Sequence, residues 1–245
     1  MNLQKLRLGQ LKPADGTEAG DTEFAKVKFL LPLDGTSGAT STSDSSNDNR
    51  TITFGESNSS ISTAQSKFGG SSLSISGTDN SYITVSSDGM SATGDFTFEC
   101  WVYDTSDVTY PGLFTNGQSS TSGLHAFVGA GATSGANKVF RLTSNGTSTN
   151  FSTELPTSQW YHLALVRSGS TIKVYVNGTA DATTVSNSST ILFAGAGTFK
   201  IGYIPTNYRF NGYLDDIRFT NGLARYTSNF TPPTSAHLTS VGDVN

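Results

Sequence analysis

The chain has 245 residues, of which 35% are hydrophobic and 14% are charged, and its formal net charge is −4. An average domain is about 25% charged, so Ser, Thr, Asn and Gly replace much of the usual surface charge. With 15 lysines and arginines in all, no basic surface for nucleic acid is expected. No apolar run approaches the roughly 18 residues of a membrane-spanning helix, so no membrane partner is expected. The single cysteine, Cys100, excludes a disulfide framework and a cysteine-based metal site.

The first 25 residues differ from those that follow. They combine several charged residues with Pro13 and three glycines, and they lack the alternation of a strand. Such a segment cannot bury itself alone, so residues 1–25 are predicted to form an N-terminal arm. The arm is either a frayed terminus or a segment that docks onto another chain. Residues 1–10 have early positive charge with no apolar region behind it, so no secretory signal peptide is expected.

From Lys26 onward, short stretches rich in β-forming residues are separated by clusters of Gly, Ser, Asn and Asp. Strands are expected at residues 26–31, 72–76, 81–85, 95–103, 160–167, 171–176, 198–203 and 210–219. No sustained apolar stripe of helical period occurs, so helices should be few and short. This pattern predicts an all-β fold, a two-sheet antiparallel jelly-roll sandwich over residues 26–236 with a C-terminal tail at 237–245.

Two places in this series predict local geometry. In the strand expected at 95–103, alternation places Phe96, Phe98, Cys100 and Val102 on one face and Thr97, Glu99, Trp101 and Tyr103 on the other. The first set is the better core candidate, which makes Cys100 a small buried hydrophobic residue and not a nucleophile. After the strand at 171–176, Asn177-Gly178 supplies the two positive-φ positions that a type I′ hairpin turn requires.

Three groups of residues carry a family resemblance, in the expected order along the chain. The first group is 29–36 with 62–73, the second is 95–102 with 159–167 and 174–178, and the third is 210–226 with 229–234. Together they resemble the concanavalin A-like jelly rolls of the laminin G-like (LamG) group. The stretches STAQSKFGGSSL (62–73) and GLARYTSNFTPPT (222–234) look especially like LamG domains in structural proteins of marine bacteriophages.

This resemblance implies a component of a virion, a protein that folds in the host cytoplasm and leaves the cell by lysis. The charge-poor surface suits life outside a cell and agrees with that location. The first hypothesis is therefore a non-enzymatic bacteriophage virion surface protein on the head or tail, with host-surface glycans as its candidate ligand. Residues 1–25 would dock it to other virion proteins, and analogy with virion appendages suggests a homo-oligomer. The alternative is a stand-alone bacterial carbohydrate-binding lectin or adhesin.

Glycoside hydrolases share this fold, so an enzyme is the third hypothesis. Retaining hydrolysis needs two carboxyl groups about 5–5.5 Å apart. No two of the glutamates share an expected strand: Glu18, Glu23, Glu56, Glu99 and Glu154. Asp215 and Asp216 are adjacent, so they are predicted to point to opposite faces of a strand. The histidines, His125, His162 and His237, lack ligand spacing, and His162 is expected to be structural. No enzymatic activity is predicted.

Calcium is the one metal that the resemblance implies, since LamG-like jelly rolls often hold one Ca²⁺ through Asp oxygens and backbone carbonyls. The resemblance maps this site onto Asp34, beside the first strand, and Asp215, near the last strand, and the two strands are expected to be neighbours. Asp34-Gly35 is also an ordinary turn signal, and Asp215 could instead pair with Arg218 or cap a loop. No other cofactor is expected.

Sugar binding requires an exposed aromatic ring flanked by hydrogen-bonding groups. The candidates on expected loops are Tyr110, next to Pro111, and the cluster Asn207-Tyr208-Arg209. Trp101 and Trp160 fall in or beside expected strands and are predicted to be packing residues. Binding sites on sandwiches are built on loops, so the fold alone does not establish one.

Overall fold

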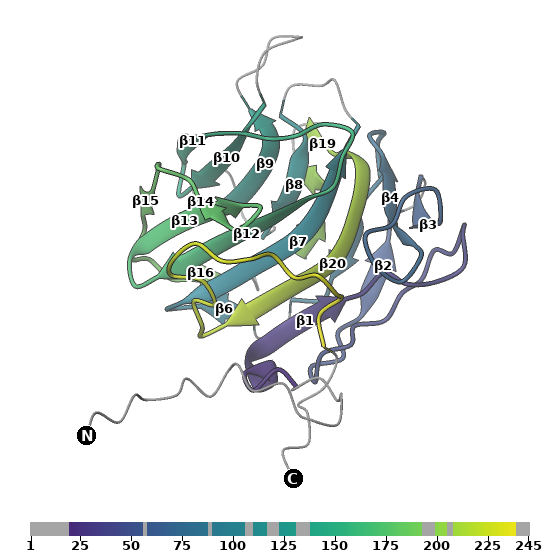
Figure 1. The fold of residues 1–245 in the computed structure, drawn as a ribbon, viewed down its shortest axis with the longest axis horizontal. Coiled ribbons are helices and arrows are strands. Elements are labelled where there is room, and N and C mark those ends of the chain that lie inside the picture. Colours follow the sequence, from purple (N-terminus) through teal and green to yellow (C-terminus); the bar gives the residue numbers. More distant parts are fainter. Residues whose placement is uncertain are drawn as a thin grey trace, which may run out of the picture.

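The computed structural model describes residues 20–55, 58–87, 90–105, 110–116, 123–130, 138–192, 199–204 and 208–238. Two large sheets lie face to face (Figure 1). The elements are η1 (Phe24–Lys26), β1 (Val27–Leu31), β2 (Ile52–Phe54), β3 (Ser59–Ser62), β4 (Ser72–Ser76), β5 (Ile83–Val85), β6 (Ser91–Ala92), β7 (Phe96–Asp104), β8 (Gly112–Thr115), β9 (Leu124–Ala130), β10 (Val139–Ser144), β11 (Thr147–Glu154), β12 (Tyr161–Ser168), β13 (Thr171–Val176), β14 (Thr179–Ala180), β15 (Val185–Ser186), β16 (Ile191–Leu192), β17 (Phe199–Ile201), β18 (Tyr203–Ile204), β19 (Tyr208–Arg209) and β20 (Asn211–Asn221).

The larger sheet has nine strands in the order β14-β13-β12-β7-β20-β4-β3, with β1 also paired to β20 and β15 to β13. The second sheet has seven strands in the order β11-β10-β9-β8-β17-β5-β2. Neighbouring strands are antiparallel in both sheets. The predicted fold class, a two-sheet antiparallel jelly-roll sandwich, is confirmed. The first and last strands are neighbours, as expected, since Leu31 pairs with Ile217.

The faces assigned from alternation are also confirmed. The four residues of β7 predicted to face inward belong to the core between the sheets: Phe96, Phe98, Cys100 and Val102. Cys100 is fully buried there. Burial raises the pKa of the Cys100 thiol well above its ordinary value, so the thiol stays protonated. Asn177 and Gly178 have φ values of 48° and 76°, as a type I′ turn between β13 and β14 requires.

Helix is scarce in the described ranges, where η1 is a single 3₁₀ turn. This agrees with the lack of helical periodicity in the sequence. Across the same ranges, no helix has the length and apolar character that crossing a lipid bilayer demands.

Both ends of the described chain pack onto the nine-stranded sheet. Phe24 is 2% exposed and joins Val27 and Leu30 in a small cluster, while His237 is 8% exposed. The packed unit is therefore longer than the predicted 26–236, because it takes in part of the expected arm and the first residue of the expected tail. Residues 1–19 of the arm and 239–245 of the tail lie outside the described residues.

A buried ionic network on the outer face of this sheet explains that packing. The Glu99 carboxylate, on β7, is fully buried and accepts two hydrogen bonds from Arg218 on β20, at 2.9 and 2.7 Å. Tyr226 donates its hydroxyl to the other Glu99 oxygen at 2.7 Å. Asp21 accepts from both Arg218 and Arg225, which ties the N-terminal end to the same cluster. Arg218 thus pairs with Glu99, and the suggested pair with Asp215 is not formed.

Two histidines complete this network. His162 is fully buried with its Nε2 atom 3.4 Å from the Glu99 carboxylate, a structural position. His237 lies 3.5 Å from Glu99 and 2.6 Å from Asp216. Burial alone would lower the pKa of His237, but Glu99 and Asp216 outweigh it and raise the pKa above the ordinary value. When protonated, His237 attracts both carboxylates and helps hold the C-terminal end on the sheet.

Acid should unfold the protein through Glu99. Burial alone would raise the pKa of Glu99, yet Arg218 and then His237 hold this pKa well below its ordinary value of 4.5. A carboxyl group with a lowered folded-state pKa adds stability that is present above its unfolded pKa and is lost as the pH falls. Urea midpoints measured from about pH 7 to about pH 3 should therefore drop below pH 4.5. A double variant, Glu99→Met with Arg218→Met, should show a shallower drop, and an equal drop would contradict this assignment.

Candidate functional site

Two of the tyrosines singled out in the sequence, Tyr110 and Tyr208, meet on the outer face of the seven-stranded sheet. Their ring centroids are 5.9 Å apart in an edge-to-face arrangement. Phe127 of β9 contacts both rings, at 5.3 Å from Tyr208 and 6.3 Å from Tyr110. Both tyrosines are partly exposed and Phe127 is 6% exposed. We call Tyr110, Phe127 and Tyr208 the aromatic cluster.

Arg141 adds hydrogen-bond donors to this cluster. It lies on β10 directly opposite Phe127, and its guanidinium carbon is 4.9 Å from the centroid of the Tyr110 ring. Strand alternation explains the placement, because Ala126 and Val128 point into the core and leave Phe127 on the outer face. The arrangement combines partly exposed rings with a cation that offers several N–H groups.

The short β18–β19 hairpin brings Tyr208 to this position. Its backbone lies against Gly112 of β8: a methyl group on Gly112 would come 2.9 Å from the Ile204 nitrogen and 2.5 Å from the Tyr208 carbonyl oxygen. Glycine is therefore required for the hairpin to lie this close to β8. Tyr110 itself has a φ of 62°, a backbone conformation that is uncommon for a residue other than glycine.

The other two residues of the predicted loop cluster stand apart from it. Arg209 forms an ion pair with Asp79, near the end of β4. Asn207 lies outside the described residues. The structure thus brings together Tyr110 and Tyr208 from the predicted set, adds Phe127 and Arg141, and directs Arg209 elsewhere.

The tryptophans agree with the packing roles expected for them. Trp101 is 5% exposed on the outer face of the nine-stranded sheet, where Phe68 contacts its ring edge-to-face and the Lys67 ammonium lies 3.8 Å from its centroid. Trp160 is partly exposed and packs against Tyr103 at 5.5 Å.

Asp215 and Asp216 do not point to opposite faces, so that prediction is wrong. The register of β20 shifts between Asp215 and Arg218, and Asp216 has a φ of 49°, which marks a bulge. Asp215 accepts hydrogen bonds from the backbone of Lys67 and Phe68, and Asp216 accepts from His237. All these partners cover the same outer face. Both carboxyl groups are fully buried, so neither is open to a glycosidic bond.

The predicted calcium residues, Asp34 and Asp215, contact one segment, Lys67–Gly69. Asp215 accepts from Lys67 N at 2.7 Å, and a methyl group on Gly69 would overlap the Asp34 carboxylate. Burial, and then Asp216, raise the pKa of Asp34. Burial raises the pKa of Asp215 to about 7 against the opposing backbone hydrogen bonds, and its Oδ1 atom is buried without a partner in the described ranges.

An oxygen left without a partner suits a hard cation, and Ca²⁺ accepts carboxylate and carbonyl oxygens. The part of the chain that is described holds no group of three or more His, Cys, Asp or Glu side chains placed for a metal. A calcium ion held by Asp34 and Asp215 would therefore need backbone carbonyls as well, and calcium stays a prediction.

Calcium should raise the thermal stability if this prediction is right. Calcium at about 100 times its Kd adds about 2.7 kcal/mol, or about 5–10 °C in Tm for a chain of this size. Tm measured in calcium and again in EDTA tests this, with Asp34→Asn and Asp215→Asn expected to remove the difference. Asp48→Asn, which changes an aspartate that lies in the same β1–β2 connection as Asp34 but pairs with Arg50, serves as the control. Equal Tm values in calcium and EDTA would contradict the site.

A comparison with known protein families identifies the superfamily of this chain. Residues 76–224 match the model of the laminin G-like family described as the concanavalin A-like lectin/glucanases superfamily. The chain belongs to this superfamily. A comparison with curated proteins finds no match.

Solved structures of the superfamily fold include similar proteins at low identity. Domain 4 of AbnA, an extracellular arabinanase of Geobacillus stearothermophilus solved with arabinotriose, has a TM-score of 0.57 at 20% identity, over 81% of this chain and 93% of that one. The binding domain of Paraclostridial Mosquitocidal Protein 1 has a TM-score of 0.58 at 15% identity, over 81% and 49%. The botulinum neurotoxin serotype G binding domain has 0.56 at 14% identity, over 83% and 48%. The chain spans about half of each toxin binding domain. These likenesses show the shared fold.

Sequence reasoning missed Phe127 and Arg141 in the aromatic cluster. The signal for Phe127 was present, because Leu124, Ala126 and Val128 alternate with it and face the core. Arg141 alternates in the same way between Phe140 and Leu142. What the local pattern lacked was the pairing of β9 with β10, which puts Arg141 opposite Phe127.

Proposed function

We propose that this chain is a non-catalytic carbohydrate-binding protein and that its ligand contacts the aromatic cluster. The observation that carries the proposal is the meeting of Tyr110, Phe127 and Tyr208 on one sheet face, beside the Arg141 guanidinium. Sugars place their apolar C–H faces on aromatic rings while their hydroxyl groups accept from nearby donors. Arg141 offers such donors at the edge of the rings.

Two further observations support a binding role. Domain 4 of AbnA was solved with arabinotriose, and cell entry of botulinum neurotoxin type C, a protein of similar fold, is described as dependent upon interaction with two ganglioside molecules. The candidate acids in the described ranges are buried or ion-paired: Asp215 and Asp216 lie under the covering loops, and Glu99 pairs with Arg218. A lectin role uses none of these groups.

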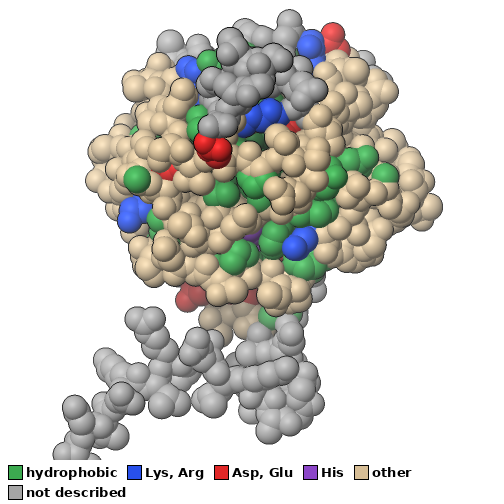
Figure 2. Space-filling view, turned by 45° about the horizontal axis from the view of Figure 1, so that its top comes forward, with side chains coloured by type: hydrophobic (Ala, Val, Ile, Leu, Met, Phe, Trp, Pro, Cys, Tyr) green, Lys and Arg blue, Asp and Glu red, His purple; other side chains and the backbone are tan. Residues whose placement is uncertain are grey.

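The finer proposal is that the protein sits on the surface of a bacteriophage virion and engages host-surface glycans. It is supported by the residues that resemble phage LamG domains and by the scarcity of charge. On the face shown in Figure 2, most of the surface is neither charged nor hydrophobic, and the hydrophobic side chains form separate small patches. A stand-alone bacterial lectin with the same cluster is the second candidate.

A glycan array with the full chain tests the binding function. We expect selective binding that falls at least about tenfold in Tyr208→Ala and Tyr110→Ala, since an aromatic contact is worth about 1 kcal/mol or more beyond its buried area. Tyr213→Ala is the matched control, because Tyr213 is a partly exposed tyrosine of β20 on the other sheet. No binding by the wild-type chain, or equal loss in all three variants, would overturn the proposal.

Purified particles test the virion location. We expect mass spectrometry to detect this chain in phage particles and deletion of residues 1–19 to prevent its incorporation. That deletion leaves Asp21 and Phe24, which pack on the sandwich, in place. Secreted protein in a bacterial culture, with none in particles, would favour the stand-alone lectin.

A further inference from the structure

A second candidate site lies on the opposite sheet, over the β12–β13 hairpin. Three cross-strand pairs line its outer face: Ala164 with Tyr175, Val166 with Lys173, and Ser168 with Thr171. The chain that follows β20 crosses β12 and covers part of this strip (Figure 1). Tyr226 and Phe230 pack on the cluster of Ala164, Val166 and Tyr175, and both rings contact Tyr175. The second and third pairs form the floor of a cavity of about 220 Å³.

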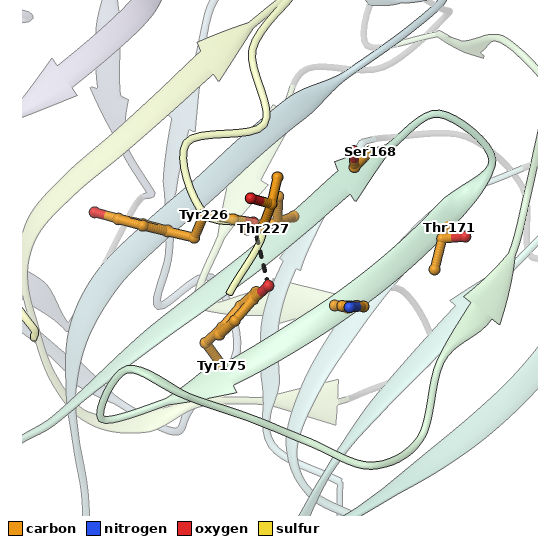
Figure 3. A pocket seen from close by; sticks show the side chains of 7 residues that line it. Ser168, Thr171, Tyr175, Tyr226 and Thr227 are labelled. Carbon is orange, nitrogen blue, oxygen red and sulfur yellow. Dashed lines mark hydrogen bonds between the residues drawn. The ribbon is translucent and has the colours of Figure 1, made fainter. Parts of the chain in front are cut away.

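Tyr226 forms a rigid wall of this cavity. Its ring stacks on Phe230 at 3.6 Å with an interplanar angle of 7°, and its hydroxyl donates to the buried Glu99 carboxylate. Its carbonyl oxygen accepts from the Tyr175 hydroxyl at 3.2 Å, the contact drawn in Figure 3. Three contacts with different groups hold Tyr226 in place, so the wall is formed before any ligand arrives.

The lining of the cavity combines one positive charge with several hydroxyl groups. Lys173 is the only charged side chain among the residues that line it. No hydrogen bond or ion pair joins the Lys173 ammonium to another residue in the described ranges, so its charge is uncompensated within them. Ser168 and Thr227 are exposed and Thr171 is partly exposed, so three hydroxyl groups line the same cavity as Lys173 (Figure 3 labels these three residues).

We propose that this cavity binds a single carboxylate-bearing pyranose unit, the terminal uronic acid of an acidic glycan. The sugar carboxylate pairs with Lys173, the ring lies against Tyr226, and the sugar hydroxyls bond with Ser168, Thr171 or Thr227. The volume suits one ring, because pockets that enclose drug-sized ligands are about 300–1,000 Å³. The site is separate from the aromatic cluster, which lies on the other sheet, so either can fail without the other.

Two-dimensional ¹H–¹⁵N NMR of the full chain, titrated with sodium glucuronate and separately with glucose, tests this proposal. We expect glucuronate to shift the amide signals of β12, β13 and residues 226–227. The same signals should respond at least about tenfold more weakly to glucose, which lacks the carboxylate. Shifts confined to the aromatic cluster, or equal responses to the two sugars, would overturn the proposal.

Charge variants test whether Lys173 provides the positive charge that glucuronate binding requires. Lys173→Met keeps most of the side-chain stem and should weaken glucuronate binding at least about tenfold. Thr171→Glu places a negative charge beside Lys173 and should abolish binding. Lys26→Met, at a partly exposed lysine near the other end of the sheet, is the control and should bind like the wild type. Wild-type affinity in Lys173→Met, with its Tm unchanged, would overturn the proposal.

Discussion

The Glu99→Ala variant is expected to lose about 3–5 kcal/mol of unfolding free energy, because breaking a buried ion pair leaves its partner charge uncompensated. Arg218 is 7% exposed and would keep its charge on the sheet face, with Asp21 as the remaining ion-pair partner among the described residues. Tyr226 would also lose its acceptor. Urea unfolding at neutral pH, followed by tryptophan fluorescence, measures this loss.

Two further variants separate the ion pair from simple packing. Replacing both partners, with Glu99→Met and Arg218→Met, should recover much of the lost stability, since apolar residues of similar volume remove the uncompensated charge. Glu154→Gln changes an exposed glutamate and should stay within about 0.5 kcal/mol of the wild type. If Glu99→Ala were as stable as Glu154→Gln, the network would not hold the chain ends.

Phe199→Ala should cost about 3–5 kcal/mol, the usual range for truncating a fully buried phenylalanine. Phe199 lies on β17 of the seven-stranded sheet and contacts the rings of Phe29, Phe98 and Phe219 on the nine-stranded sheet. It also stacks on Phe114 at 5.3 Å within its own sheet. The ring therefore bridges the two layers, and its removal leaves a cavity at their centre.

Urea unfolding of Phe199→Ala and Phe199→Leu tests this bridge. Leucine keeps much of the apolar volume, so Phe199→Leu should lose clearly less than Phe199→Ala. Phe68→Ala truncates a partly exposed phenylalanine that contacts Trp101 and provides the comparison. A loss in Phe199→Ala no greater than in Phe68→Ala would contradict the central role of the ring.

Local pattern was sufficient to predict much of the fold. The strand expected at 171–176 is β13, the one at 72–76 is β4, and the inward face of β7 matches its alternation. The turn at Asn177-Gly178 was predicted because a positive φ at both positions strongly favours these residues. In each case the local structure is determined by interactions between residues close together in the sequence.

What the sequence did not reveal depends on partners distant along the chain. The bulge at Asp216 replaces the strict alternation on which the opposite-face prediction relied, and its partner His237 lies beyond the last strand. In the same way, the sequence indicated Tyr110 and Tyr208 separately, each as a tyrosine on an expected loop. Their meeting depends on the β18–β19 hairpin lying against Gly112 of β8, which no local pattern encodes.

The place of β20 in the sheet has a consequence for biosynthesis. This strand pairs with β1, β4 and β7, yet among the described strands it is the last in sequence order. Until residue 221 has left the exit tunnel, β7 has an open edge and β1 has no neighbour, so the growing polypeptide presents unpaired backbone to its surroundings. Completion of the larger layer must therefore follow the synthesis of β20, and it depends on contacts between strands far apart in the sequence, which form slowly.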